Sequence, residues 1–448
     1  MSEHPRSFGV FALILLGQSL AMLGATVTDF ALGIWAYETA GNVTHYTLIA
    51  VASTLPALLA GPFVGVWVDR LPRKRALLIA QTGNALAILA LALMHVADTL
   101  TVTSILLVVP FTAVFSLVLQ IAFSASVSLM VPADRLNQAN ALIGLVFGVV
   151  QLTGPLLGGI AMDHIGLDAI LMVTAAAFGV ALVSLVFSPI PDPGGRAVRE
   201  SPSVWREITD AYRYLQGRPG LLGGLWMFTA IWFCVSVIQV LFVPVVLGFG
   251  SKTDLGVIQT TAGLGLLVGG ILMVAWKGPQ RLTWGIAIPC LMIAICFIVV
   301  PLTTTVWVMA TASMVAMATV PMATSASQTL WQRKIDPLFQ GRVFALRNII
   351  MKAAQPAAFL AAGVLADRVF EPGMQPGAAL ANVFGAAWGT GEGRGSALLM
   401  SASGVISLIC VLWILATPRI RRADIDLSDD GLSALPDAPA AGESRSPQ

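Results

Sequence analysis

The sequence predicts an all-α integral membrane protein in which twelve transmembrane helices form two six-helix halves. Three observations lead to this fold class. Hydrophobic residues make up 57% of the 448 residues and charged residues 11%, whereas a soluble domain carries about 25% charged residues. The apolar residues fall into long runs, and a helix needs about 20 of them to cross a bilayer. A polar interval divides these runs into two sets of six.

The apolar runs are too long and too uniform for the alternating strands of a membrane barrel, so they are expected to be helices. From the N-terminus, the expected spans are 8–36, 46–68, 76–96, 101–130, 139–162, 167–188, 221–248, 255–276, 282–302, 306–330, 343–366 and 396–416. The four cysteines lie inside these runs without metal-ligand spacing. We therefore expect them to act as small apolar residues, and we expect no metal or cofactor.

Lys and Arg are distributed unevenly between the two sides of the expected bundle. All but three of the 25 lie in the N-terminal segment, the even-numbered loops, the start of the eleventh span or the C-terminal tail; the exceptions are Lys252, Arg368 and Arg394. Basic residues concentrate on the cytoplasmic side of membrane proteins. The bias predicts a multi-pass protein of the inner (cytoplasmic) membrane with both termini in the cytoplasm.

The polar interval 189–220 is expected to be a cytoplasmic linker between an N-terminal half (1–188) and a C-terminal half (221–418). Within it, four apolar residues recur at helical spacing: Trp205, Ile208, Tyr212 and Leu215. This pattern predicts an amphipathic helix on the inner membrane face, with a solvated linker as the alternative. The polar tail 419–448 has little to bury and is expected to be disordered.

The two halves show a weak internal repeat. At the offset of 204 residues that separates Gly159 from Gly363, Asp163 also aligns with Asp367. These residues lie at or near the ends of the fifth and eleventh expected spans, which are equivalent places in a six-plus-six arrangement. Parallel repeats around a central pathway are typical of transporters.

A short loop after the second expected span concentrates charge. It begins with one acid, Asp69, and carries four cations in six residues: Arg70, Arg73, Lys74 and Arg75. An acid at the C-terminal end of a helix lies near negative carbonyls, so it needs a positive partner, which the loop cations or another helix N-terminus could supply. Gly65, one turn earlier, is expected to let a neighbouring helix approach closely. Alternatively, the cations serve only as an orientation signal.

This loop resembles the signature of the major facilitator superfamily, except that Pro72 stands where the family usually has Gly. The resemblance covers essentially the whole chain, because the twelve spans and the central linker match as well, and it implies the major facilitator fold. In that family the loop acid and arginines form a cytoplasmic latch between the halves. The resemblance therefore implies that Asp69, Arg70 and Arg73 hold the outward-open state.

The fifth expected span carries a second motif, Gly154-Pro155-x-x-Gly158-Gly159. It resembles the antiporter motif of drug-exporting members of the family, although Val150 stands where that motif usually has Gly. Proline removes a backbone hydrogen bond, and small residues permit bending and tight packing. Simple helix packing is the alternative interpretation of the same residues.

The energy source is expected to be an ion gradient, because the chain has no Walker-type ATP-binding motif. A proton carrier requires an acid within a span, and Asp29 is the candidate. Trp35 and Tyr37 look like an outer aromatic belt, so Asp29 could instead be a hydrated residue at the outer mouth. Many family members carry a coupling arginine in the fourth span, but span 101–130 has none, which weighs against an arginine relay.

Other polar residues within spans are candidates for substrate contact. Lys352 and Gln355 could meet an anionic substrate or a lipid phosphate, although Lys352 could also extend to the inner surface. Several glutamines could face a central cavity or make helix–helix hydrogen bonds: Gln18, Gln120, Gln239, Gln259 and Gln328.

The stretches 28–41 and 339–348 resemble the branch that contains macrolide exporters and the enterobactin exporter. This implies a proton-coupled antiporter, not an enzyme, that exports hydrophobic or amphiphilic drugs or natural products by alternating access. The expected partners are a small-molecule substrate, protons and the lipid bilayer, without ATP or nucleic acid, and the expected state is a monomer. The alternatives are a siderophore or nutrient carrier and, from another class, a lipid flippase or membrane sensor.

Overall fold

The computed structural model describes residues 8–132, 135–190, 204–276, 279 and 281–418. Within these ranges it has twelve helices long and apolar enough to cross a membrane, which confirms the predicted all-α membrane fold. The observed helices match the expected spans within a few residues at most ends. The tail expected to be disordered, 419–448, lies outside the described residues.

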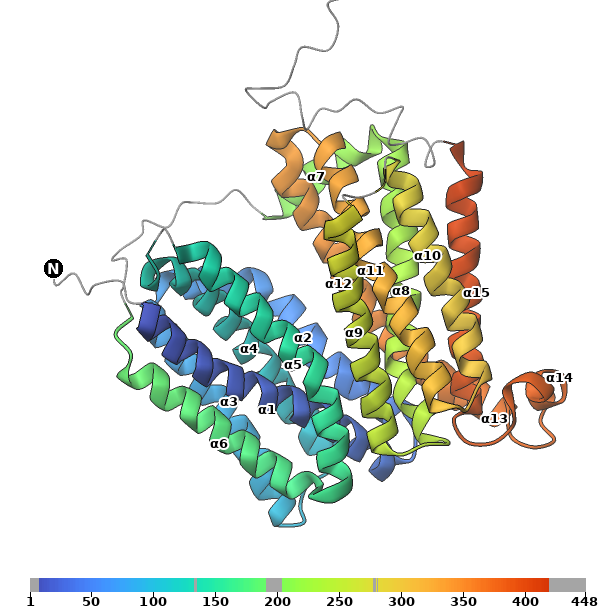
Figure 1. Cartoon of the computed structure of the whole chain (residues 1–448), viewed down its shortest axis with the longest axis horizontal. Helices are drawn as coiled ribbons and strands as arrows, with labels where there is room; N and C mark the ends of the chain where they lie inside the picture. The colour runs from blue at the N-terminus through green and yellow to red at the C-terminus, as the bar shows by residue number, and fades with distance from the viewer. Residues whose placement is uncertain (1–7, 133–134, 191–203, 277–278, 280, 419–448) are drawn as a thin grey trace, which may run out of the picture.

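The first six membrane helices pack on one another as an N-terminal bundle (Figure 1). They are α1 (Phe8–Ala40), α2 (Val43–Arg70), α3 (Arg73–Val96), α4 (Val102–Met130), α5 (Leu136–His164) and α6 (Gly166–Phe187). Short connections separate them. The start of α4, for example, is a capping box in which the side chains of Thr101 and Ser104 each accept the other's backbone N–H.

The other six membrane helices form a C-terminal bundle in the same way. They are α8 (Pro219–Leu247), α9 (Lys252–Trp276), α10 (Leu282–Val299), α11 (Val306–Lys334), α12 (Pro337–Leu365) and α15 (Arg394–Ala416). The backbones of α9 and α11 approach closely at two glycines. A Cβ at Gly265 or Gly269 would overlap the backbone of Met314 or Ala318, so only glycine permits this contact.

A compact structure connects α12 to α15. It consists of a π-helical turn (Ala366–Phe370), α13 (Glu371–Gly373) and α14 (Ala379–Trp388), which projects sideways from the bundle (Figure 1). Glu371 caps α15 by accepting the backbone N–H of Ser396 at 2.8 Å and its hydroxyl at 2.6 Å. The indole of Trp388 donates to the Ser401 hydroxyl at 2.9 Å and thereby holds α14 against α15.

The linker contains a helix, α7 (Val204–Gln216), whose apolar side packs on protein. Its residues Ala211 and Leu215 are fully buried in a cluster with residues of the C-terminal bundle. The Tyr214 ring stacks on Phe339 with 4.5 Å between centroids, and its hydroxyl accepts the backbone N–H of Asp336 at 3.2 Å. These contacts fasten α7 to the C-terminal half, and a placement on the membrane face stays a prediction.

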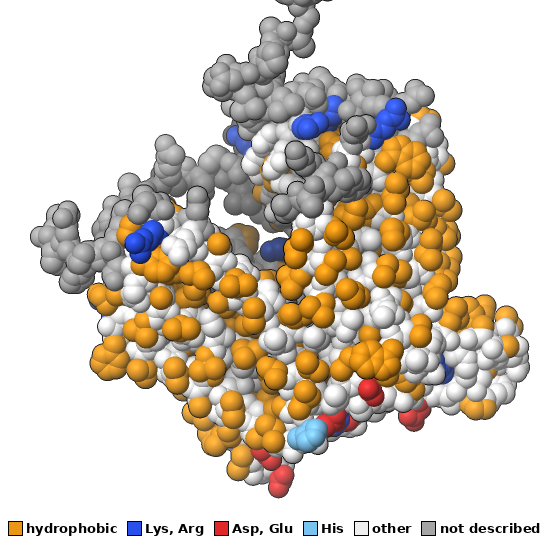
Figure 2. Space-filling model, viewed as in Figure 1, with side chains coloured by type: hydrophobic (Ala, Val, Ile, Leu, Met, Phe, Trp, Pro, Cys, Tyr) orange, Lys and Arg blue, Asp and Glu red, His pale blue; other side chains and the backbone are white. Residues whose placement is uncertain are grey.

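The two bundles meet at one end and lean apart at the other (Figure 1). The main contacts between them join α5 to α9 and α2 to α12. We call the meeting end the acidic end, because it carries Glu38, Asp163, Asp168, Asp254, Asp367, Glu371 and Glu392. We call the opposite end the basic end, because it carries Arg70, Arg75, Arg218, Arg281 and Arg333. Figure 2 shows acidic side chains gathered at one end and basic side chains at the other.

Candidate functional site

The cleft between the two halves is the candidate site, and Figure 2 shows it as a hollow toward the basic end. Helices of both halves form its walls. Positions that face lipid carry large exposed apolar side chains. An exposed polar residue on the opposite side of the same helix therefore faces the cleft, and this criterion identifies the lining residues.

Two polar stripes satisfy this criterion. On α4, three exposed polar residues recur every fourth position, nearly opposite the exposed Leu107 and Phe111: Ser116, Gln120 and Ser124. On α11, the fourth membrane helix of the other half, the same spacing gives Thr324, Gln328 and Gln332, all exposed. The stripes occupy equivalent places in the two halves. Sequence reasoning singled out Gln120 and Gln328 individually but missed Gln332 and the stripes, although a search for polar residues at i, i+4 and i+8 would have found them.

Arg347 on α12 positions one of these stripes. Its Nη1 donates to Gln328 Oε1 at 3.0 Å, and its Nη2 donates to Ser327 Oγ at 3.1 Å. The guanidinium lies 5.4 Å from the centre of the Trp331 ring, and the side chain is only 9% exposed. The Gln328 amide is thus held in one orientation. Sequence reasoning counted Arg347 among the cytoplasmic cations and gave it no role in the site.

Asp29 lies deep in α1, eleven residues from the end at Ala40, or about 16 Å along the helix. Its side chain is exposed. Leu13, Leu16 and Leu20 are the large exposed apolar residues of α1, and they point about 180° away from Asp29 at 100° per residue. The Asp29 carboxyl group therefore faces away from lipid, which favours a position in the cleft over one at the outer mouth.

The position of Lys352 on α12 also favours the cleft. It lies eleven residues, or about three turns, from Gly363, whose missing side chain makes room for α2 of the other half. Both positions share one face of α12, and Lys352 is exposed. On the same helix Gln355 is half-buried, and on α8 Gln239 is exposed between buried neighbours. In the described part of the chain, no hydrogen bond joins Asp29 to any of these side chains.

The charged loop contacts its own half. Lys74 Nζ donates to the carbonyls of Val186 and Ser188 at 2.8 and 2.9 Å, and Arg73, which is buried, donates to the carbonyl of Val68 at 2.9 Å. Arg70 is exposed. Pro72 fits the turn, since its φ of −53° is close to the value that the proline ring imposes. The Asp69 side chain lies outside the described residues.

Gly65 does not bring a neighbouring helix close in this conformation. A Cβ built at this residue would have nothing within 4 Å. The expected close approach of a neighbouring helix at Gly65 is therefore not present in this conformation, in which the two bundles lean apart at the basic end (Figure 1).

The glycine and proline motif of α5 lies at two helix interfaces. A Cβ at Gly154 would come within 2.5 Å of the Thr26 side chain on α1, and one at Gly158 within 2.8 Å of the Phe30 ring. A Cβ at Gly159 would come within 2.5 Å of the carbonyl of Lys252 on α9, in the other half. Close packing between the halves thus depends on this glycine.

Pro155 also takes part in the contact between the halves. Gly256 on α9 packs on its carbonyl, since a Cβ there would lie 2.7 Å from that oxygen. One turn away, the Thr260 hydroxyl donates across the interface to the carbonyl of Leu152 at 2.9 Å. Pro155 lacks the N–H that would bond the carbonyl of Gln151 four residues earlier, which loosens this turn of α5 beside the contact.

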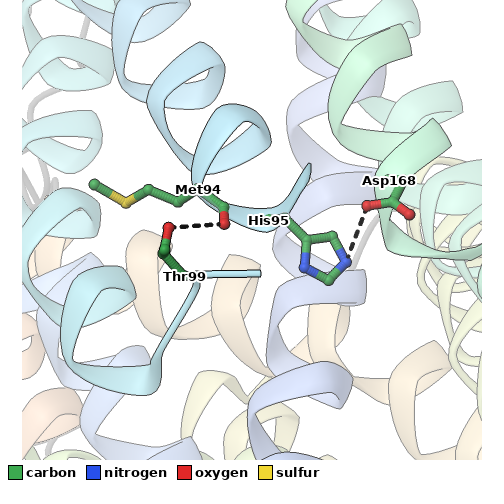
Figure 3. A network of polar contacts seen from close by, with 4 residues as sticks. All are labelled: Met94, His95, Thr99 and Asp168. Atoms are coloured by element: carbon green, nitrogen blue, oxygen red, sulfur yellow. Dashed lines mark hydrogen bonds and ion pairs between the residues drawn. The ribbon is translucent and has the colours of Figure 1, made fainter. Parts of the chain in front are cut away.

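A polar contact within the N-terminal half lies at the acidic end. Nε2 of His95 on α3 is 3.2 Å from Oδ1 of Asp168 on α6 (Figure 3). The Trp35 ring of α1 meets the His95 ring edge-on with 5.9 Å between centroids. After the end of α3, the Thr99 hydroxyl donates to the carbonyl of Met94 at 3.0 Å (Figure 3). These contacts join α3, α6 and α1 and do not bridge the halves.

Two bundles of six membrane helices, separated by a polar-lined cleft that is closed at one end, define a membrane transport protein. The family model of the Major Facilitator Superfamily matches residues 14–359, and the chain belongs to this family. Membership confirms the resemblance predicted from the charged loop and the span pattern. The family and its relatives described below are transporters and not enzymes.

The chain is similar to known efflux proteins at low identity. It is 23% identical to macrolide efflux protein A of Streptococcus pyogenes over 368 residues, which cover 80% of this chain and 90% of that protein. It is 26% identical to the multidrug efflux pump Tap of Mycolicibacterium fortuitum over 374 residues, which cover 80% of this chain and 90% of that pump.

Solved structures share the fold. A bacterial homologue of the human lysosomal transporter Spinster, in an inward-facing conformation, has a TM-score of 0.66 at 15% identity, covering 93% of this chain and 99% of that one. A bacterial homologue of the iron transporter ferroportin, also inward-facing, has a TM-score of 0.65 at 13% identity, covering 91% of this chain and 99% of that one.

Proposed function

We propose that this transporter is a proton-coupled antiporter that exports hydrophobic or amphiphilic drugs or natural products by alternating access. The observation that carries the proposal is the cleft: it is closed at the acidic end, open toward the basic end, and lined by polar stripes from both halves. A second conformation, closed at the basic end, would complete a transport cycle. The efflux proteins among the relatives support export as the direction.

The proposed orientation follows from charge. The basic end faces the cytoplasm of a bacterial inner membrane, because Lys and Arg favour that side. Both termini are then cytoplasmic, and the described conformation faces inward, ready to accept substrate from the cytoplasm or the inner leaflet. In the outward-facing conformation the charged loop would meet the other half. In this conformation Lys74 and Arg73 of the loop bind carbonyl groups of their own half, which supports an inward-facing assignment.

Asp29 is the proposed proton carrier. An acid in the middle of a membrane helix is costly and usually functional, and the cleft would give Asp29 a route to water. One proton crossing 100 mV supplies about 2.3 kcal/mol. One pH unit adds about 1.4 kcal/mol. Together they could sustain a substrate gradient of about 500-fold.

The proposed substrates are amphiphilic. The cleft offers neutral hydrogen-bonding groups on the stripes, with Asp29 on one wall and Lys352 on the other. Gln120, Gln239 and Gln328 can bind polar substituents, while the apolar residues between them can accept rings or chains. The proposed active unit is a monomer, because one chain supplies both walls of the cleft.

Reconstitution into proteoliposomes tests the proposal. With an imposed pH gradient, ethidium or erythromycin should move in exchange for protons, and Asp29→Asn should abolish gradient-driven movement while leaving binding of the compound intact. Asp168→Asn is the matched control, because Asp168 lies at the acidic end and contacts only its own half. If a fluorescent phospholipid moved and neither compound did, the protein would be a flippase. If Asp29→Asn retained full coupled movement, Asp29 would not be the carrier.

A further inference from the structure

Two carboxylates bridge the halves at the acidic end in matching ways. Oδ2 of Asp163, at the end of α5, accepts the backbone N–H of Thr253 at 3.0 Å and its hydroxyl at 2.6 Å. The carboxylate of Asp367, just after α12, accepts the backbone N–H groups of Val43 at 2.9 Å and Thr44 at 2.7 Å. The acceptors come from opposite halves, and the donors lie in the first turns of α9 and α2.

The first turn of each receiving helix is built to leave these donors available. The first N–H groups of a helix have no partner within it and carry partial positive charge. In α2 the Asn42 side chain accepts the N–H of His45 at 3.0 Å, and in α9 the Ser251 hydroxyl accepts the N–H of Asp254 at 3.1 Å. Each local cap satisfies the third residue of its helix. The earlier donors therefore turn to an acid of the other half.

A glycine four residues before each acid permits the approach. A Cβ at Gly159 would lie 3.1 Å from the Cα of Thr253, and one at Gly363 would lie 3.0 Å from the Cα of Thr44. Both distances are tighter than ordinary contact, so the glycines let the helix starts come close enough for the acids to cap them. The two Gly-x-x-x-Asp segments lie 204 residues apart. The weak sequence repeat thus corresponds to two equivalent contacts between the halves.

We propose that Asp163 and Asp367 form a twin latch, in which each half caps a helix of the other and the acidic end is thereby held closed. The latch breaks whenever the transporter opens toward the acidic end. This inference rests on the proposed alternating access and names the side chains that set its equilibrium. Lys252 and Glu38, whose charged groups are 3.0 Å apart, add one further ion pair between the halves.

The setting of the latch suits repeated opening. Both carboxylates line a cavity of about 850 Å³ at the acidic end, so water can replace each lost hydrogen bond. Asp163 is exposed, whereas Asp367 is half-buried and binds two backbone N–H groups. Bonds shielded from water contribute more. Asp367 therefore contributes more than Asp163 to the stability of the twin latch.

Distance measurement between spin labels tests the proposal on the full-length protein. The labels sit on cysteines replacing Gln138 and Arg281, which are exposed at the basic end of opposite halves, after the four native cysteines have been changed to alanine. Opening at the acidic end brings these labels together. We expect Asp367→Ala to raise the ratio of short to long distances about tenfold, equivalent to about 1.4 kcal/mol. For Asp163→Ala we expect about threefold, and for the double variant about thirtyfold.

Two control variants distinguish the loss of a contact between the halves from the loss of any acidic side chain at the same end. Asp168→Ala removes an acid at the same end that contacts only its own half, and Asp254→Ala removes a carboxylate that contacts only its own helix start. Neither should change the distance ratio by more than about twofold. Any latch variant that does not fold is replaced by its Asn counterpart, which keeps one acceptor oxygen and should give a smaller shift in the same direction.

Two outcomes would overturn the latch. One is that the Asp163 and Asp367 variants show the same ratio of short to long distances as the labelled protein with both aspartates in place. The other is that Asp168→Ala changes this ratio as much as Asp367→Ala does. The measurement needs neither substrate nor gradient. Failure of coupled export would leave it unaffected, and failure of the latch would leave the export experiment standing.

Discussion

Replacing Gly159 by alanine should force the acidic end open. The added Cβ would lie 2.5 Å from the carbonyl oxygen of Lys252, about 1 Å short of an ordinary contact. The Cβ is fixed by the backbone of α5 and the oxygen belongs to the backbone of α9, so no side-chain rotation can relieve the strain. Overpacking of this kind costs about 1–3 kcal/mol, and here the cost applies only while the halves are together. The equilibrium should therefore shift toward opening by about 5- to 150-fold.

The assay is the rate at which a membrane-impermeant maleimide labels a cysteine at Val43, which is only 2% exposed in the closed end. The matched control is Gly148→Ala on the same helix, where an added Cβ would lie at an ordinary 3.8 Å from Leu267. Both substitutions raise helix propensity by about 1 kcal/mol, so this effect cancels. If Gly159→Ala labelled no faster than Gly148→Ala, the close contact of α5 and α9 would not be what keeps the end shut.

Three further predictions concern other contacts. Tyr214→Ala, which removes the stack on Phe339, should speed hydrogen exchange of α7 about tenfold, whereas Tyr212→Ala, whose side chain is 37% exposed, should have a smaller effect. Arg347→Met should lower stability by about 1–3 kcal/mol, because two hydrogen bonds are lost, and thermal unfolding of the purified protein measures this. Gln120→Ala should change the KM for some exported compounds more than for others, since a stripe residue selects among polar substituents; equal changes for all compounds would contradict this.

The helices could be predicted from sequence because membrane spans depend on local composition. Each run of about 20 apolar residues must form a helix, whatever lies beside it. The charge bias and the loop signature added the division into halves and the family, and the family is confirmed. What packs against each helix could not be predicted in this way. The pattern of α7 identified an apolar side containing Leu215, yet nothing in that pattern shows whether lipid or protein covers it.

The latch and the fixation of Gln328 could not be predicted, for a related reason. Asp367 caps a helix start 324 residues earlier in the chain, and no local pattern encodes a contact at such a separation. The repeat that includes Asp163 and Asp367 was visible, but its role depends on which helix starts lie opposite. Gln328 was visible too, whereas its fixation by Arg347 depends on the packing of α11 on α12.

The close contact of α9 and α11 has a mechanical consequence. At Gly265 and Gly269 the backbones of α9 and α11 are in direct contact. No side chains lie between the two helices at these points, so no side-chain repacking can let one helix slide past the other. The two helices should therefore move as one rigid unit when α9 is displaced. Because α9 contacts the N-terminal half and α11 carries Gln328, we expect separation of the halves to move the proposed substrate-binding wall together with α9.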